Sequence, residues 1–349
     1  MDALASSLER SPELFPHTWD LRSDSVTLVR LTKADYETTS FLDERVLGAR
    51  TLSRTLPYAQ LAQSVGESRL RARCHFIFHI GHVGSTLLSR LLGTDRRLFA
   101  LREPAILRTL ARLKTDPELQ PRAFDNTEFE ERQTLFLKLW SRTFEPGQTA
   151  LLKATSFASE LAPRLLADPS APKALLLFVS PEACFATILA AANAREEAKT
   201  LTEGRLKRLH RRIGREVWRL GALSEGEALA ASWVAEMSAL VEARDAAGPR
   251  AMPLDFDRFL ANPPEQLAAV LRHFDCETTP NKVGEILAGP HMQRYSKAPE
   301  HAYSPELRRE VLDEARKAHA SEIAKGLAWL EQAARDTALV RSCLDLAAH

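Results

Sequence analysis

A short turn gathers two glycines and two hydroxyl residues in the run Gly81-His-Val-Gly-Ser-Thr86. It follows the apolar run 76–78 and precedes a segment whose leucines, at 87, 88, 91 and 92, have helical spacing. A strand, a glycine turn and a helix N-terminus in this order direct backbone N–H groups toward one point, where hydroxyls add further donors. The pattern predicts an anion site, with phosphate as the natural ligand. The alternative is a tight strand-to-helix connection that binds nothing.

This turn contains no lysine. The phosphate loop of nucleoside triphosphatases carries Gly-Lys-Ser/Thr after a four-residue spacer. Here Gly84 is followed directly by Ser85, and no magnesium-binding motif accompanies the turn. A kinase-like phosphotransferase is therefore the weakest of the functions that the turn suggests.

Two charged residues follow apolar runs that read as neighbouring strands. Glu103 comes just after the run 97–101, and Lys153 ends the run 149–153. The carboxyl ends of adjacent parallel strands open into one crevice, so we expect both side chains near the glycine turn. A carboxylate there could accept a proton, and a lysine at the end of a buried strand must reach water or an anion. The alternatives are a solvated Glu103 paired with Arg102, and a plain surface lysine.

Short apolar runs alternate with helical patterns from residue 74 onward. The strand candidates are 74–80, 98–101, 149–153, 174–179 and 251–254. This alternation predicts an α/β fold, a three-layer parallel sheet flanked by helices. We expect residues 1–70 to form an N-terminal extension packing on the core, with one strand at 26–31. Residues 71–349 would form the α/β domain, with a largely helical insertion at about 185–247.

The helical insertion carries clear start signals and a buried stripe. Ser224 and Glu227 have the spacing of a capping box. The following apolar residues, at helical spacing, are expected in the core: Leu229, Trp233, Met237, Leu240 and Val241. Further helices are expected to begin at Pro263 and, as the last long helix, after Ser304.

A dense run of cations lies in the same insertion. Its members are Arg205, Lys207, Arg208, His210, Arg211, Arg212, Arg215 and Arg219. Apolar residues at 206, 209, 213, 217 and 220 would form the buried stripe of one helix, which leaves the cations on its remaining faces. Such a run is usually a solvated face or is paired with acidic neighbours.

The composition sets wider limits. The 349 residues carry a net charge of +1, which gives no reason to expect nucleic acid as a partner. No apolar stretch approaches the roughly 20 residues of a membrane span, and the first residues lack the pattern of a secretion signal. The four cysteines are far apart, without metal-type spacing, and Cys74 and Cys184 are expected in the core. We expect a cytoplasmic protein without a metal site.

The turn resembles the 5′-phosphosulfate-binding loop of sulfotransferases, usually written Pro-Arg/Lys-Ser-Gly-Thr-Thr-x-Leu. On this match Val83, Gly84, Ser85 and Thr86 cover the end of the loop, after Gly81, and His82 stands where the family carries Arg or Lys. The resemblance implies a P-loop-like fold and 3′-phosphoadenosine 5′-phosphosulfate as the donor of a sulfuryl group. His82 would become a cation beside the donor phosphate, or would only cap the turn.

The same resemblance suggests roles for the two charged residues. The spacing from His82 to Glu103 matches that between the basic loop residue and the catalytic glutamate of tyrosylprotein sulfotransferases, which makes Glu103 a candidate general base. Bacterial sulfotransferases often carry a Lys-Thr-Pro-like element where Lys153 and Thr155 stand, so Lys153 would neutralise the leaving phosphate.

The fourth strand region departs from the family. Sulfotransferases usually follow this strand with Arg-Asp/Asn-Pro and a later serine, which bind the 3′-phosphate of the donor. Val179 stands at the arginine position, Ser180 can still donate a hydrogen bond, and Thr187 replaces the serine. Arg205 and Arg208 are candidates to bind the donor phosphate or an anionic acceptor instead. Lys297, in the basic segment 294–297, is a weaker candidate in a late loop.

These observations predict a sulfotransferase that acts on the hydroxyl of a small-molecule or glycan acceptor. The expected catalytic residues are Glu103, His82 and Lys153. The expected donor-binding residues are Gly81, Val83, Gly84, Ser85, Thr86, Ser180, Thr187, Arg205, Arg208 and Lys297. The departures from the family at His82 and Val179 keep open a non-catalytic nucleotide-binding protein with the same fold.

Overall fold

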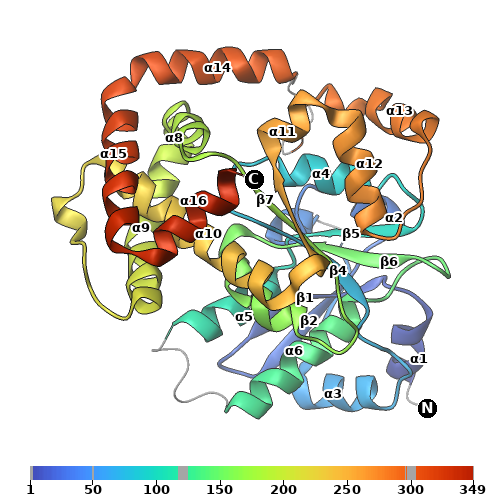
Figure 1. The fold of residues 1–349 in the computed structure, drawn as a ribbon. Coiled ribbons are helices and arrows are strands. Elements are labelled where there is room, and N and C mark those ends of the chain that lie inside the picture. Colours follow the sequence, from blue (N-terminus) through green and yellow to red (C-terminus); the bar gives the residue numbers. More distant parts are fainter. Residues whose placement is uncertain (1–2, 49–50, 117–124, 295, 297–303, 349) are drawn as a thin grey trace.

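Parallel strands form the centre of the molecule (Figure 1). The computed structural model describes residues 3–48, 51–116, 125–294, 296 and 304–348. Among these residues the central sheet has the order β5-β6-β4-β7-β8, and every neighbouring pair is parallel. Its strands are β4 (Cys74–His79), β5 (Leu98–Arg102), β6 (Thr149–Lys153), β7 (Ala174–Phe178) and β8 (Ala251–Asp255). All five predicted strands are confirmed, because near-continuous apolar runs are buried on both faces of a parallel sheet.

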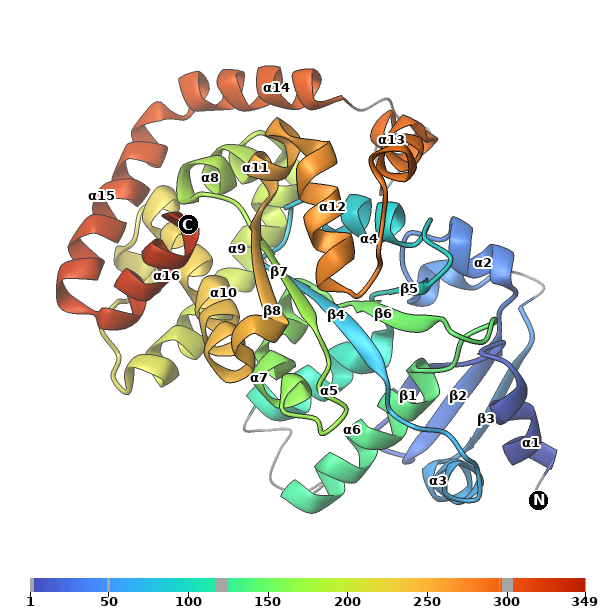
Figure 2. The same ribbon diagram turned by 45° about the vertical axis from the view of Figure 1, so that its right-hand side comes forward.

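Helices connect the strands and flank the sheet, as Figure 2 shows from a second side. They are α4 (Ser85–Leu92), α5 (Ala105–Thr115), α6 (Asn126–Trp140), α7 (Ala162–Leu166), α8 (Pro181–Leu189), α9 (Ala192–Ile213), α10 (Glu225–Ala247), α11 (Phe256–Ala261), α12 (Pro263–His273) and α13 (Pro280–Ala288). The predicted α/β fold with helices flanking a parallel sheet is confirmed. None of the helices in the described part of the chain combines the length and apolar character that crossing a bilayer requires.

The N-terminal residues build a second, antiparallel sheet in the order β1-β2-β3. Its strands are β1 (Leu14–Asp20), β2 (Ser25–Arg30) and β3 (Ser53–Pro57), and the helices α1 (Ala3–Arg10), α2 (Lys33–Thr38) and α3 (Tyr58–Gly66) accompany them. The sequence predicted only the middle strand. This unit (blue) lies at the edge of the molecule away from α14 and α15 (Figure 1).

Two buried arginines of the central domain bind the C-terminal end of α2. The Arg102 Nε donates to the carbonyl of Thr39 at 2.9 Å, and the Arg90 Nη2 donates to the carbonyl of Thr38 at 3.0 Å. Cations at the last carbonyls of a helix complement its dipole. The next part of the chain is fixed to the sheet as well, since the Leu42 N–H donates to the Arg102 carbonyl at 2.7 Å. The segment after α2 is therefore anchored at the carboxyl end of β5.

The helical insertion forms largely as predicted, with one correction. The capping box of Ser224 and Glu227 is present, and the predicted stripe of α10 is buried. The basic helix α9, however, ends at Ile213, because Gly214 follows with a left-handed φ of +78°. Val217 is consequently exposed, not part of a buried stripe. Arg205 and Arg208 are buried and paired with Glu236, so the alternative that the cationic run is paired with acidic neighbours holds for these two.

The C-terminal segment is divided into helices, where the sequence predicted one long helix. They are α14 (Pro305–Ala318), α15 (Ala320–Asp336) and α16 (Ala338–Ala348), and they curve around α8 and α10 (Figure 2). At the crossing of α10 and α15 the backbones touch: a Cβ built on Gly226 would lie 1.8 Å from the carbonyl oxygen of Glu322.

This contact predicts a large effect for one added methyl group. The substitution Gly226→Ala should lower the free energy of unfolding by about 3 kcal/mol, because α15 must move away. The matched control is Gly284→Ala in α13, where nothing lies within 4 Å of an added Cβ; alanine there should be neutral or stabilise the helix by up to about 1 kcal/mol. Urea unfolding measures both. Equal effects of the two substitutions would contradict the tight crossing.

Candidate functional site

The turn between β4 and α4 has an unusual backbone. Gly81, His82 and Gly84 all have left-handed φ values, of +90°, +54° and +69°. Successive amides in such a turn point inward and form a cradle for an anion. Gly84 is required for a second reason, since a Cβ there would lie 2.1 Å from the ring of the buried Phe256 at the start of α11. A non-glycine residue at positive φ, such as His82, is uncommon and often marks a functional site.

The N-terminus of α4 is open to an additional partner. No side chain caps this helix, so its first N–H groups lack the acceptor that a capping residue would supply. The Thr86 side chain is only 2% exposed, and its Oγ1 has no hydrogen-bond partner in the described structure. A buried hydroxyl without a partner is costly. An anion held by this turn would satisfy these donors, which fits the predicted role of the loop.

His79 fixes the shape of the turn. Its Nδ1 accepts the N–H of Gly81 at 3.0 Å, and its Nε2 lies 2.8 Å from the carbonyl oxygen of Ala154. A ring that accepts at Nδ1 and donates at Nε2 is the neutral tautomer. The histidine thus ties the turn to the end of β6. A histidine as the last residue of the strand before a glycine turn is the only sequence signal for this role.

Glu103 and Lys153 form an ion pair at the carboxyl ends of β5 and β6. The Lys153 side chain is 1% exposed, so the surface-lysine alternative is wrong. The Glu103 N–H also donates to the Lys153 carbonyl at 2.7 Å, and Glu103 has a φ of +55°. The alternative pairing of Glu103 with Arg102 is wrong too, because the Arg102 guanidinium binds backbone carbonyls at the end of α2.

A cleft of about 650 Å³ opens above this pair. The loop, Glu103 and the segment after β6 form its floor, the segment after α2 and α5 form one wall, and α9 forms the other. Its lining residues are Phe41, Arg45, His79, Gly81, His82, Glu103, Arg108, Arg112, Thr155, Ser156, Phe157, Glu197, Thr200, Leu201, Gly204, Arg205 and Arg208. Thr155 contributes an Oγ1 that has no partner in the described structure. His82 Nε2 lies 3.4 Å from the Glu197 carboxylate on α9.

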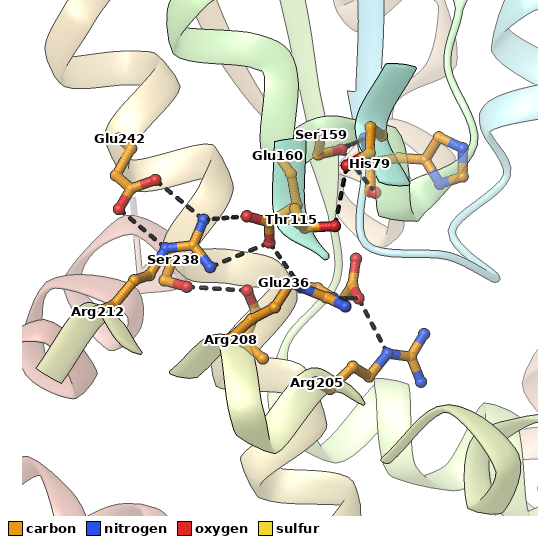
Figure 3. Close-up of polar contacts among 12 residues, drawn as sticks. His79, Thr115, Ser159, Glu160, Arg205, Arg208, Arg212, Glu236, Ser238 and Glu242 are labelled. Carbon is orange, nitrogen blue, oxygen red and sulfur yellow. Dashed lines mark hydrogen bonds and ion pairs between the residues drawn. The ribbon is translucent and has the colours of Figure 1, made fainter. Parts of the chain in front are cut away.

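The arginines in the C-terminal half of α9 bind buried carboxylates (Figure 3). Glu236 of α10 accepts from Arg205 Nε at 2.9 Å and from Arg208 Nη2 at 2.7 Å. Arg208 also donates to Glu160 at 2.8 Å. Arg212 reaches Glu160 as well, at 2.7 Å. These charges are therefore already neutralised, and the network fastens α9 to the rest of the molecule.

Other predicted site residues lie outside the cleft lining. Val83, Ser85 and Thr86 are buried beneath the loop surface. In α8, the Ser180 hydroxyl accepts the Ala183 N–H as an N-cap, and the Thr187 hydroxyl donates to the Ala183 carbonyl at 2.7 Å. Val179 is fully buried. Lys297 falls outside the described residues, whereas the neighbouring Ser296 carbonyl accepts from Arg90 of α4.

Comparison with known proteins finds similarity in structure but no match to a family model or a curated sequence. A sulfotransferase domain from the curacin biosynthetic pathway is similar at 16% identity and a TM-score of 0.39, over 76% of this chain and 99% of that one. Sulfotransferase STF9 from Mycobacterium avium is similar at 14% identity and a TM-score of 0.38, over 75% and 80%. Retinol dehydratase, in complex with androsterone and the inactive cofactor PAP, is similar at 13% identity and a TM-score of 0.31, over 93% and 94%.

At these values the likeness carries no functional conclusion, and the function proposed below rests on the residues of the cleft. Among the described residues, no three His, Cys, Asp or Glu side chains are grouped as metal ligands. All four cysteines are free and buried. The burial of Cys74 and Cys184 confirms the sequence prediction for these two.

The buried arginine network predicts a strong dependence on Glu236. The substitution Glu236→Gln leaves two buried guanidinium groups short of one negative charge, which should lower the free energy of unfolding by about 3 kcal/mol. Glu203→Gln is the matched control, because its pair with Lys207 on the same helix is exposed and contributes little. Chemical denaturation followed by circular dichroism measures both. A Glu236→Gln protein as stable as the control would show that the network is not needed for stability.

Proposed function

We propose that this protein transfers a sulfuryl group from 3′-phosphoadenosine 5′-phosphosulfate to the hydroxyl of a small-molecule or glycan acceptor. The observation that carries the proposal is the ion pair between Glu103, which lines the cleft together with the glycine turn, and the buried Lys153. A carboxylate and an ammonium at one point can serve the two partners of such a transfer, since one takes a proton and the other stabilises a negative charge.

In this proposal Glu103 accepts the proton of the acceptor hydroxyl. The acceptor oxygen forms a bond to sulfur, the bond from sulfur to the bridging oxygen of the donor breaks, and the electron pair of that bond stays on the leaving phosphate. Lys153 is paired with Glu103, and in this proposal its ammonium stabilises the negative charge that forms on the leaving oxygen. The chemistry depends mainly on positioning and charge stabilisation, as in phosphoryl transfer.

The glycine turn suits the 5′ end of such a donor. The left-handed backbone, the uncapped start of α4 and the unpartnered Thr86 hydroxyl all present donors to an anion. His82 lies at the same end of the cleft, where its Nε2 is 3.4 Å from the Glu197 carboxylate and where it can also contact a donor held by the turn.

The residues expected at the 3′-phosphate fit less well. Val179 brings no charge, and the hydroxyls of Ser180 and Thr187 are engaged within α8. Arg205 and Arg208 are neutralised by buried carboxylates, so we propose that they shape the cleft wall. We therefore assign the donor's 5′ end to the loop and no residue to its 3′-phosphate. This mismatch is what favours the second candidate, a non-catalytic nucleotide-binding protein.

Binding and turnover separate the candidates. Calorimetry should show that the wild-type protein binds adenosine 3′,5′-bisphosphate and prefers it to ATP. Preference for ATP would favour a phosphotransferase, and binding without release of sulfate or transfer from the labelled donor would favour the non-catalytic protein. Binding of neither nucleotide would contradict both nucleotide-based functions.

Glu103→Gln tests the assignment of the base. It should lower turnover by about 10²- to 10⁴-fold, the usual contribution of a general base, while the affinity for adenosine 3′,5′-bisphosphate changes little. Glu44→Gln is the control, because Glu44 is an exposed carboxylate in the segment that forms the same wall. Thermal unfolding of both variants checks that they fold. Wild-type turnover in Glu103→Gln would refute the role of this residue.

A further inference from the structure

Two arginines of α5 lie in the wall of the cleft beyond Glu103. Arg108 and Arg112 are four residues apart, so they point from the same face of the helix, and both line the cleft. Glu103 comes just before α5. With a rise of about 1.5 Å per residue, the two arginines lie roughly 5 and 10 Å further along the helix axis than its first residue, Ala105. The cleft therefore carries cations at a defined distance from the proposed base.

The other arginines of the cleft have carboxylate partners outside it. Arg45 binds Asp43 and lies over the Phe41 ring, with its guanidinium carbon 3.5 Å from the ring centre. Arg205 and Arg208 bind Glu236, as described above. These cations balance local negative charge, so they leave little attraction for a ligand.

Arg108 and Arg112 differ from these residues. The closest carboxylate oxygen to Arg108 belongs to Glu44, at 3.9 Å, and the Glu44 side chain is 74% exposed. Such an exposed, long contact contributes little. Arg112 is exposed, and no carboxylate within the described part of the chain pairs with it. Among the described residues, Arg112 thus faces the cleft without a paired carboxylate, and Arg108 has only the long contact with Glu44 and the nearby charge of Asp43, which is already paired with Arg45.

The α9 wall contributes one carboxylate, Glu197, to the lining of the cleft. It also presents Thr200, Leu201 and Gly204, which are neutral. Glu197, the acidic residue of this wall, is the one that contacts His82 at the loop. The cleft is therefore polarised, with the proposed reaction at the Glu103 end and an uncompensated positive charge at the α5 end.

We infer that the acceptor carries an anionic group, a carboxylate or a sulfate, which binds Arg108 and Arg112 while its hydroxyl lies at Glu103. Guanidinium groups bind planar or tetrahedral oxyanions through paired, charge-assisted hydrogen bonds. Leu201 and Phe157 offer an apolar lining for the part of the acceptor between its two polar ends. This inference rests on the proposed sulfuryl transfer and names its substrate class.

Matched acceptor pairs test the inference with labelled donor. The pairs are 4-hydroxyphenylacetate with 4-hydroxyphenylacetamide, and glucuronate with glucose. We expect transfer to the anionic member of a pair with a kcat/KM at least about tenfold above that of the neutral member. The double variant Arg108→Ser/Arg112→Ser should abolish this preference through KM. The variant Arg108→Ser/Arg112→Lys, which keeps one cation, should retain part of the preference. Arg211→Ser is the control, since Arg211 is exposed on α9 and does not line the cleft.

The affinity for adenosine 3′,5′-bisphosphate separates the possible outcomes. If it stays within twofold of wild type in the double variant while the anionic preference is lost, the inference is supported. Loss of nucleotide affinity with an unchanged acceptor preference would assign the arginines to the donor and overturn it. Equal use of both members of each pair, or no transfer to any anionic member, would overturn it as well. If wild type binds no bisphosphate, the proposed function itself fails.

Discussion

One buried ammonium constrains the whole cleft. Lys153 ends an inner strand of the sheet, where an unpaired buried charge would cost several kcal/mol. Its partner must come from a neighbouring strand end, and the register that pairs Arg102 with Lys153 leaves Glu103 one residue beyond. The left-handed backbone at Glu103 is the conformation in which the structure holds this pair. The position of the acidic group at the cleft floor thus follows from the burial of a cation.

The central fold could be predicted because its strands are buried on both faces and are nearly continuous in apolar residues. The N-terminal sheet gave weaker signals. The strand β3 (Ser53–Pro57) exposes every residue but Leu56, and β1 (Leu14–Asp20) contains Pro16 and His17. Neither strand therefore shows a regular alternation of buried and exposed residues. The breaks between the C-terminal helices were not predicted either. They fall at His319 and Thr337, and neither residue is a strong helix breaker.

For the site, the sequence located the turn and two charged strand ends but not their partners. The loop, Glu103 and Lys153 were expected together because parallel strands open at one edge. The neutralisation of Arg208 by Glu160 and Glu236 was not visible, since these carboxylates are 48 and 28 residues away in the chain. Helical spacing shows which residues share a face, but not which neighbour covers that face. Uncompensated charges, such as Arg112, can be recognised only after the compensated ones are known.

Different contacts position the two sides of the cleft, and the arginine contacts at the end of α2 position one of them. One wall begins with a segment that Arg102, at the end of β5, and Arg90, near the C-terminal end of α4, both bind, whereas the loop lies between β4 and the start of α4. The backbone of the loop is fixed by His79 and Phe256. Changes in the chain around Phe41 and Arg45 can therefore reshape the acceptor side while the anion-binding turn keeps its form. The acceptor side of the cleft can therefore vary in sequence, whereas the anion-binding turn must keep its residues.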